Sequence, residues 1–222
     1  MPNPLPVVQK IHQRKTTKAF EAGRSLSPEQ SAAVRELLRM SPSSTNAQPW
    51  HFFIATTDAG KQRIATGASG NFAYNEPKIL NAAEVVVLCA RTRLDDAYLT
   101  QVLDQETKDG RLANEEARTN QRNVRKGYVQ KHEAAGSLLN WSARQVYIAL
   151  GFLLLGAAEI GVDACPIEGF DCSAVDAELG LSEKGLASIV VVALGHKSAA
   201  DFNAALPKSR LPEAQVITEL EA

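Results

Sequence analysis

Three polar segments of the sequence carry side chains that together could bind an anion. They are residues 14–18, 43–46 and 208–210, which supply arginines, lysines, hydroxyl groups and an amide. A terminal phosphate carries nearly two negative charges and several acceptor oxygens, which guanidinium forks, ammonium groups and hydroxyl donors satisfy. Each segment alone is typical of a solvated surface. Because all three share this chemistry, we predict that they form one phosphate site.

A fourth segment, residues 166–170, predicts a turn that approaches a flat ligand. Its sequence is Pro-Ile-Glu-Gly-Phe, and Gly169 has no side chain to keep the backbone away from a ring. By itself the segment would be an ordinary proline-led turn. Together with the phosphate site it indicates a bound cofactor.

The motifs of several other enzyme classes are missing from the sequence. It has no G-x-G-x-x-G fingerprint after a predicted strand, no Walker loop and no G-x-S-x-G elbow. The four histidines are scattered without i, i+4 pairing or neighbouring cysteines, so we expect no metal site. These absences disfavour hydrolases, P-loop proteins and Rossmann dehydrogenases.

The elements that must position these segments indicate an α+β fold. Residues 50–57 are rich in aromatic and β-branched side chains. Residues 85–89 and 189–194 are continuous apolar runs, typical of strands that are covered on both faces. These three strands would form a central sheet. No repeat or break in composition divides the sequence, so we expect one domain over residues 1–222.

The clearest helix signal follows residue 26. Ser27 as N-cap, Pro28 at N1 and Gln30 at N3 form a capping-box pattern before a helix that should end near Met40. Residues 41–49 should form a loop, and residues 206–212 should be extended. Further helices are expected at residues 7–14, 59–67, 95–104, 114–134, 138–159 and 171–179.

The helix expected at residues 138–159 is apolar on most sides. Its apolar run, residues 146–158, is shorter than the roughly 18 residues that a membrane span needs, so we interpret it as a core helix. A helix that is apolar all round must be covered all round. A 222-residue chain with few strands can hardly provide that cover alone, which predicts a dimer interface.

Overall composition excludes some partners and indicates a compartment. The chain has 24 Lys and Arg against 25 Asp and Glu, which gives no general field for nucleic acid or an anionic membrane. Its three cysteines are an odd number without C-x-x-C spacing, as expected in a reducing compartment. The first residues lack the apolar core of a signal peptide, so we expect a cytoplasmic protein.

Five motifs, in order and spacing, resemble those of the nitroreductase family, flavoenzymes that hold FMN and use NAD(P)H. The resemblance covers residues 14–212. It implies a nitroreductase-like α+β fold with a central, mostly antiparallel sheet covered by helices, in an intertwined homodimer. The motifs are R-x-[ST]-x-K-x-F at 14–20, P-S-S-x-N-x-Q-P-W at 42–50, G-N-F-A-Y-N at 70–75, P-I-E-G-F at 166–170 and L-P-K-S-R-L-P at 206–212.

The resemblance also implies roles for individual residues at an FMN site. The phosphate and ribityl chain would be held by Arg14, Lys15, Thr16, Lys208 and Arg210. The pyrimidine end of the flavin would meet Lys18 and Asn75, and the N5 atom would lie near the backbone of Glu168 and Gly169, with Pro166 in the same set. The partner subunit would contribute Ser43, Ser44 and Asn46.

The implied mechanism is a ping-pong cycle in which NAD(P)H delivers a hydride to flavin N5 and leaves. A nitroaromatic, quinone or dihydropteridine then takes two electrons in the same pocket, so no acid–base dyad and no catalytic side chain is expected. The pocket would be lined by Lys18, Thr45, Asn71, Tyr74, Asn75, Lys78 and Tyr128.

Four positions depart from the pattern that the resemblance implies, and they bear on substrate range. Lys15 stands where similar proteins carry histidine, Tyr74 and Tyr128 stand for phenylalanines, and Gly127 replaces a further aromatic residue. A flavin or pterin reductase, or a quinone or enone reductase with incidental nitro reduction, therefore stays open as an alternative. A non-catalytic flavin-binding dimer is the second alternative. The sequence leaves the physiological substrate and the choice between NADH and NADPH undetermined.

Overall fold

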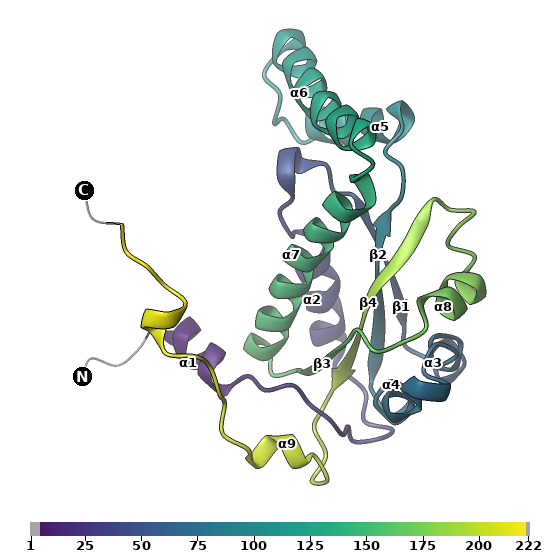
Figure 1. The fold of residues 1–222 in the computed structure, drawn as a ribbon, viewed down its shortest axis with the longest axis vertical. Helices are drawn as coiled ribbons and strands as arrows, with labels where there is room; N and C mark the ends of the chain where they lie inside the picture. Colours follow the sequence, from purple (N-terminus) through teal and green to yellow (C-terminus); the bar gives the residue numbers. More distant parts are fainter. Residues whose placement is uncertain (1–4, 221–222) are drawn as a thin grey trace.

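The computed structural model describes residues 5–220. Four strands form one antiparallel sheet in the order β1-β2-β4-β3 (Figure 1). The expected antiparallel sheet of an α+β fold is therefore confirmed. The strands are β1 (Trp50–Ala55), β2 (Glu84–Arg91), β3 (Asp163–Ile167) and β4 (Leu186–Gly195).

Strand β3 corrects the sequence prediction, which counted three strands and placed Pro166 in a turn. Pro166 lies inside β3 and is paired in register with Val192 of β4. A proline cannot donate to a strand ladder, so it is tolerated on edge strands, and the strand order places β3 at an edge of the described sheet. The turn begins one residue after Ile167, with Glu168.

Both faces of the sheet are covered by helices. Along β2, Val85 and Val87 pack in one apolar cluster, and Val86 and Leu88 pack in the other, because successive side chains point to opposite faces. This arrangement confirms that the continuous apolar runs are strands buried on both sides. The helices on one face are α2 (Pro28–Arg39) and α7 (Leu138–Glu159), and those on the other are α3 (Asp58–Ala65), α4 (Glu76–Leu80) and α8 (Cys172–Leu179) (Figure 1).

Local signals in the sequence explain where the clearest helix begins. The Ser27 hydroxyl accepts a bond from the Gln30 amide, and the Gln30 side chain accepts one from the Ser27 amide, so the predicted capping box of α2 is confirmed. Sequence reasoning missed several elements of three to six residues, which are too short to display a helical period. They are η1 (Ser44–Asn46), η2 (Gly70–Asn75), α4, α9 (Phe202–Ala205) and η3 (Glu213–Gln215).

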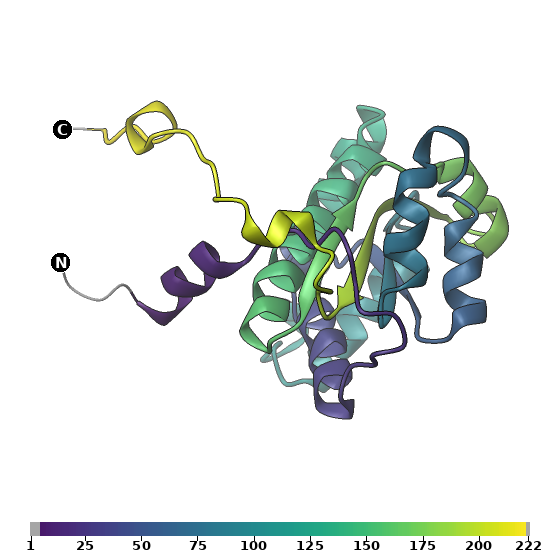
Figure 2. The ribbon, with the colours of Figure 1, turned by 90° about the horizontal axis from the view of Figure 1, so that it is seen from below.

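Three parts of the chain lie outside the two helical layers. Helices α5 (Asp96–Lys108) and α6 (Glu115–Ala134) pack together and project beyond one end of the sheet (Figure 1). At the other end, α1 (Pro6–Gln13) and the chain after α9 extend to the same side of the molecule (Figure 2). None of the residues of α1 is buried.

Helix α7 is apolar but is covered on one side. Val146 and Leu153 are fully buried against the sheet, whereas Tyr147, Ile148 and Phe152 are exposed. By length and composition α7 could cross a membrane, yet 44% of its most apolar window is buried inside this chain. Its packing is that of a core helix that also carries an uncovered apolar face.

Candidate cofactor site

Two of the three predicted anion-binding segments meet in space, although they lie at opposite ends of the sequence. The chain after α1 and the chain after α9 together line a cavity of about 260 Å³. Among the described residues that line this cavity, none is acidic. They are Arg14, Lys15, Thr16, Asn203, Leu206, Pro207, Lys208, Ser209 and Arg210.

The positive charges in this cluster are not neutralised. Burial lowers the pKa of Arg14, and Arg210 lowers it further. Burial also lowers the pKa of Lys208, and the charges of Arg14, Arg210 and Lys15 add to that effect. The Nη1 atom of Arg14 is buried and has no hydrogen-bond partner in the described part of the chain. An unsatisfied donor among uncompensated cations fits an anion with several acceptor oxygens.

Backbone contacts fix the segment that carries Arg14 and Lys18. The Thr17 amide donates to the Ala164 carbonyl of β3 at 3.1 Å, and the Lys18 amide donates to the Asp201 carboxylate at 3.1 Å. The same carboxylate caps α9. An edge strand and a short helix therefore hold the segment, which accounts for its irregular path.

Side-chain contacts pin the C-terminal segment to the N-terminal one. The Lys15 ammonium donates to the carbonyls of Ala204 and Leu206, at 2.5 and 2.6 Å, and the Lys208 ammonium donates to the Ile11 carbonyl. Lys15 thus lines the cavity while it also fixes the path of the chain toward Lys208.

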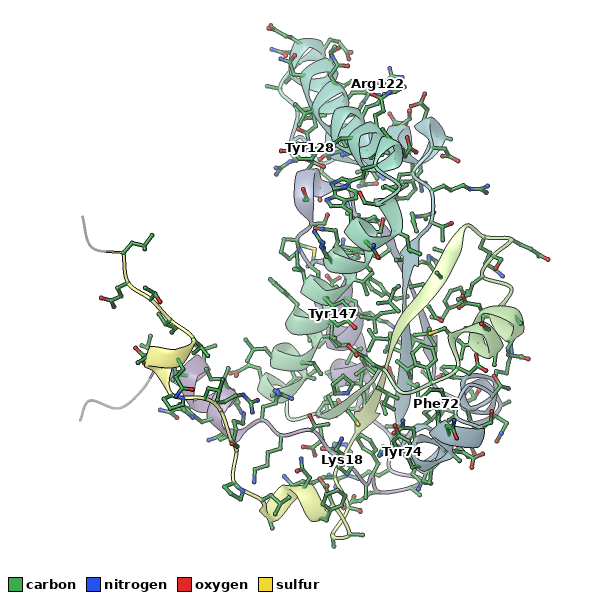
Figure 3. The ribbon with its side chains drawn as sticks, in the orientation of Figure 1. Lys18, Phe72, Tyr74, Arg122, Tyr128 and Tyr147 are labelled. Atoms are coloured by element: carbon green, nitrogen blue, oxygen red, sulfur yellow. The ribbon has the colours of Figure 1, made fainter. Side chains whose placement is uncertain are left out.

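A second cluster forms around Asn75, which is 4% exposed. Its Nδ2 donates to the Gly169 carbonyl at 2.8 Å, and its Oδ1 accepts a bond from the Lys78 ammonium at 2.6 Å. Burial lowers the pKa of Lys78, and the nearby charge of Lys18 contributes in the same direction. Two lysines and one oriented amide therefore share this end of the molecule with Tyr74 (Figure 3).

The turn after β3 packs closely against η2. A Cβ atom added to Gly169 would lie 2.7 Å from the Tyr74 hydroxyl and 3.1 Å from Nδ2 of Asn75. A side chain at Gly169 would thus displace the exposed Tyr74 hydroxyl and press against the amide of the buried Asn75. The exposed Asn71 belongs to the same 3-10 element, η2.

Sequence reasoning did not find the partner of Glu168. The hydroxyl of Tyr147, on α7, donates a hydrogen bond to the Glu168 carboxylate, and this bond raises the pKa of Tyr147 to about 12. The carboxylate next to Gly169 is therefore held by a neutral phenol. A tyrosine on the exposed face of an apolar helix was the available signal.

The third predicted segment, residues 43–46, lies elsewhere. Trp50 pairs with Ala90 near the end of β2, whereas Thr16 pairs with Ala164, whose partner in β4 faces Glu84 at the start of β2. A strand of eight residues spans roughly 25 Å. Within one chain the three segments therefore do not meet, and a site that includes all three needs residues 43–46 from a partner subunit, as the resemblance implies.

The residues predicted to line the substrate pocket also lie at two opposite ends of the molecule. Figure 3 shows Lys18 and Tyr74 at one end of the molecule and Tyr128 at the other, with Tyr147 between them. Thr45 lies in η1 and Tyr128 on α6, two elements that pack together, and Gly127 precedes Tyr128. Lys18, Asn75 and Thr45 cannot line one pocket of one chain.

Loop hydrogen bonds occupy the polar groups of residues 43–46. The Ser43 hydroxyl accepts from the Gln48 amide at 2.9 Å, and the Ser44 amide donates to the Gln145 side chain at 2.9 Å. Asn46 donates to Glu106 of α5 at 2.8 Å. The loop is thus built by contacts with the helices behind it.

Comparison with known proteins identifies the family to which this chain belongs. The sequence matches the model of the nitroreductase family over residues 11–196. It is 49% identical to an oxygen-insensitive NAD(P)H nitroreductase of Salmonella typhimurium and 46% identical to one of Enterobacter cloacae, over 97% of this chain and 100% of each relative. The chain belongs to the nitroreductase family. A crystal structure from Exiguobacterium sibiricum, in complex with FMN, shares the fold at a TM-score of 0.82 and 20% identity, over 98% of this chain and 99% of that one.

As a nitroreductase-family protein, the chain carries further residues beside the predicted segments that sequence reasoning missed. Asn203 lines the cation cavity and donates to the Thr16 carbonyl at 2.7 Å. Glu106 and Arg125 face the loop of residues 43–48 from two helices. Glu106 falls on the inward stripe of α5 with Leu99, Val102 and Leu103, and a charge on such a stripe was the signal that could have identified it.

Proposed function

We propose that this protein is an FMN-dependent oxidoreductase that uses NAD(P)H and reduces nitroaromatics and quinones by two electrons at a time. The observation that carries the proposal is the cation cluster of Arg14, Lys208 and Arg210, with its buried, unsatisfied donor and no acidic neighbour in the cavity lining. Extensive identity to two oxygen-insensitive NAD(P)H nitroreductases supports the same activity here.

The residues present fit FMN. Arg14, Lys208 and Arg210 would hold the phosphate, and the adjoining backbone at Lys15 and Thr16 would follow the ribityl chain. A hydrogen bond to a charged group is worth about 1.5–3 kcal/mol. Lys18 and Asn75 would face the polar edge of the ring, and the Glu168–Gly169 turn after Pro166 would pass beside it.

FMN, when bound, supplies the redox chemistry: it accepts a hydride from NAD(P)H and passes two electrons to the acceptor. The protein provides positioning and charge. Lys18 and Lys78 would place positive charge where a bound flavin would gain negative charge on reduction. Hydrogen bonds to Gly169 and Lys78 fix the orientation of the Asn75 amide. The Tyr147 hydroxyl donates to the Glu168 carboxylate and so holds it in place.

We further propose that the site is completed in an intertwined homodimer. The exposed apolar side chains of α7 continue into an apolar cavity of about 700 Å³ shared with α1, whose lining includes Val7, Leu37 and Phe152. Helix α1 and the chain after α9 stand away from the body of the molecule (Figure 2). The loop of residues 43–46 of one subunit would then meet the cation cluster of the other.

The remaining assignments are also proposals. Residues 1–222 would act as one domain, in the cytoplasm, where the free cysteines Cys89, Cys165 and Cys172 stay reduced. Dihydropteridines and enones are further candidate acceptors, because the hydroxyls of the exposed Tyr74 and Tyr128 make the rim of the pocket more polar. Relative rates on these acceptors, a quinone and a nitrofuran rank the alternatives.

The visible spectrum of the purified protein tests the proposal first. We expect a yellow protein that bleaches when NADPH is added without oxygen and regains its colour when a nitrofuran follows. A protein that takes up no FMN and oxidises no NAD(P)H would contradict the proposal. A flavin that NAD(P)H does not reduce would favour a non-catalytic flavin-binding dimer.

A further inference from the structure

The loop of residues 43–48 has an unusual backbone. Thr45, Asn46 and Gln48 have φ values of 51°, 52° and 47°, in the left-handed region that non-glycine residues rarely adopt. Such conformations persist where surrounding contacts determine them, and they cluster at functional sites. The contacts that hold this loop are therefore informative.

A buried ion pair grips the loop. Arg125 of α6 and Glu106 of α5 lie 2.7 Å apart, and their side chains are 1% and 4% exposed. Arg125 Nε donates to the Thr45 carbonyl at 3.0 Å, and Glu106 Oε1 accepts from the Asn46 side chain at 2.8 Å. Each ion therefore uses one atom for its partner and another for a left-handed residue of the loop.

Three neutral side chains also hold the loop. Gln121 of α6 donates to the Thr45 carbonyl at 3.4 Å. The Tyr98 hydroxyl of α5 donates to the Gln48 carbonyl at 2.5 Å, and Gln145 of α7 accepts from the Ser44 amide. Three helices thus contact four residues of the loop, at positions 44, 45, 46 and 48. The loop is fixed within one chain, before any ligand or partner subunit is considered.

The ion pair is poorly explained by stability alone. Arg125 Nη1 is buried without a hydrogen-bond partner among the described residues. Burying two charges carries a large desolvation cost, and apolar residues of similar size often serve a core equally well. The Arg125–Glu106 pair leaves one donor unsatisfied, yet two of its atoms bind the strained loop. This combination indicates that the pair is kept because it fixes the conformation of the loop.

We propose that the Arg125–Glu106 pair is a positioning device that locks the loop of residues 43–48 to the part of α6 that bears Gly127 and Tyr128, and so sets cofactor affinity and acceptor range. The proposal rests on the proposed function, in which this loop contacts FMN across the dimer. Arg125 and Tyr128 are three residues apart on one helix, so a grip on the Thr45 carbonyl fixes the distance between loop and rim.

The decisive test replaces both ions, as Arg125→Met with Glu106→Leu, which leaves no unpaired buried charge. We expect a folded protein whose FMN dissociation constant, measured by flavin fluorescence, rises about tenfold, the lower end of the loss seen when residues that support metal ligands are mutated. The KM for a nitroaromatic should change more than kcat. Amides of residues 44–48 should exchange hydrogen faster in the cofactor-free protein, a readout independent of activity.

A matched control lies on the same two helices. Arg118 and Asp104 form a partly exposed pair at 2.7 Å, and within the described part of the chain the Arg118 side chain donates to residues of α5 alone, so Arg118→Met with Asp104→Leu should leave FMN affinity and loop exchange unchanged. Wild-type FMN affinity, KM and exchange in the Arg125→Met, Glu106→Leu protein would overturn the inference. If that protein does not fold, Arg125→Lys keeps the charge but loses the fork, and unchanged affinity and exchange there would overturn it equally. A wild-type protein that binds no FMN would instead contradict the proposed function.

Discussion

At one end of the sheet, Arg14, Lys208 and Arg210 face one another with no carboxylate in the cavity lining, whereas at the other end Arg125 is buried against Glu106. The first cluster is open, and burial together with the neighbouring positive charges lowers the pKa values of Arg14 and Lys208. The second is closed, and its charges neutralise each other. Uncompensated charge indicates where a ligand supplies the missing anion, and compensated charge indicates where the protein holds its own backbone.

The largest effect should come from the open cluster. Removing both C-terminal cations, as Lys208→Ala with Arg210→Ala, should weaken FMN binding about a hundredfold or more, since each contributes a charge-assisted hydrogen bond. Flavin fluorescence titration measures this. Arg39→Ala, which removes an exposed cation paired with Glu36, is the control and should bind like wild type. Native FMN affinity in the double variant would show that the open cluster does not bind the cofactor, and the two ends would then not differ in function.

A methyl group at Gly169 should cause the next largest effect. In Gly169→Ala the new Cβ would lie 2.7 Å from the hydroxyl of the exposed Tyr74 and 3.1 Å from Nδ2 of the buried Asn75, so we expect a loss of about 1 kcal/mol in the free energy of unfolding, the lower end of the cost of overpacking. Denaturant titration measures the loss. Adding Tyr74→Phe removes the nearest atom and should restore part of the stability. Additive effects of the two changes would show that this contact is not the cause.

At the opposite end, Tyr128, which we propose for the rim of the acceptor pocket, should affect selectivity and not cofactor content. Its side chain is 46% exposed, so Tyr128→Phe removes a hydroxyl without disturbing packing. We expect the ratio of kcat/KM for a quinone over a nitrofuran to shift about three- to tenfold, with unchanged flavin content. Identical ratios would remove Tyr128 from the acceptor pocket.

The smallest effect concerns Tyr147, between the two ends. Because its hydrogen bond to Glu168 raises its pKa from 10.0 to about 12, the stabilisation is fully present below pH 10 and is lost as the pH rises toward 12. The melting temperature of wild type, relative to Tyr147→Phe, should therefore fall over that interval. Absorbance near 295 nm should assign the titration, and a normal phenol titration near pH 10 would contradict the assignment.

The sequence predicted elements whose signals are local. The capping box at Ser27 and the apolar runs of β2 and β4 need only neighbouring residues to be recognised, and each was found. Strand β3 was missed because Pro166 outweighed the rest of a short edge strand. Such a strand is stable because it pairs with β4, which a local pattern does not reveal.

In the candidate site, too, the residues within local motifs could be predicted and the long-range contacts between them could not. The resemblance identified the cations, the Asn75 region and the loop of residues 43–46, but their grouping depends on the sheet register that separates the loop from the rest. Glu106, Arg125 and Tyr147 were missed because their partners lie far away in sequence. Long-range pairing is a property of the topology.

The position of the cation cluster in the gene has a consequence for variants. The residues of the two apolar clusters that cover the sheet run from Phe20 to Leu194, whereas Arg14, Lys208 and Arg210 lie outside those limits. A premature stop codon after Ala205 would keep every core side chain and delete two of the three cations. Such a truncated protein should accumulate in the cell as a folded but colourless product. The yield of folded protein would then depend on the codons for the core, and its yellow colour on the codons at the two ends of the gene.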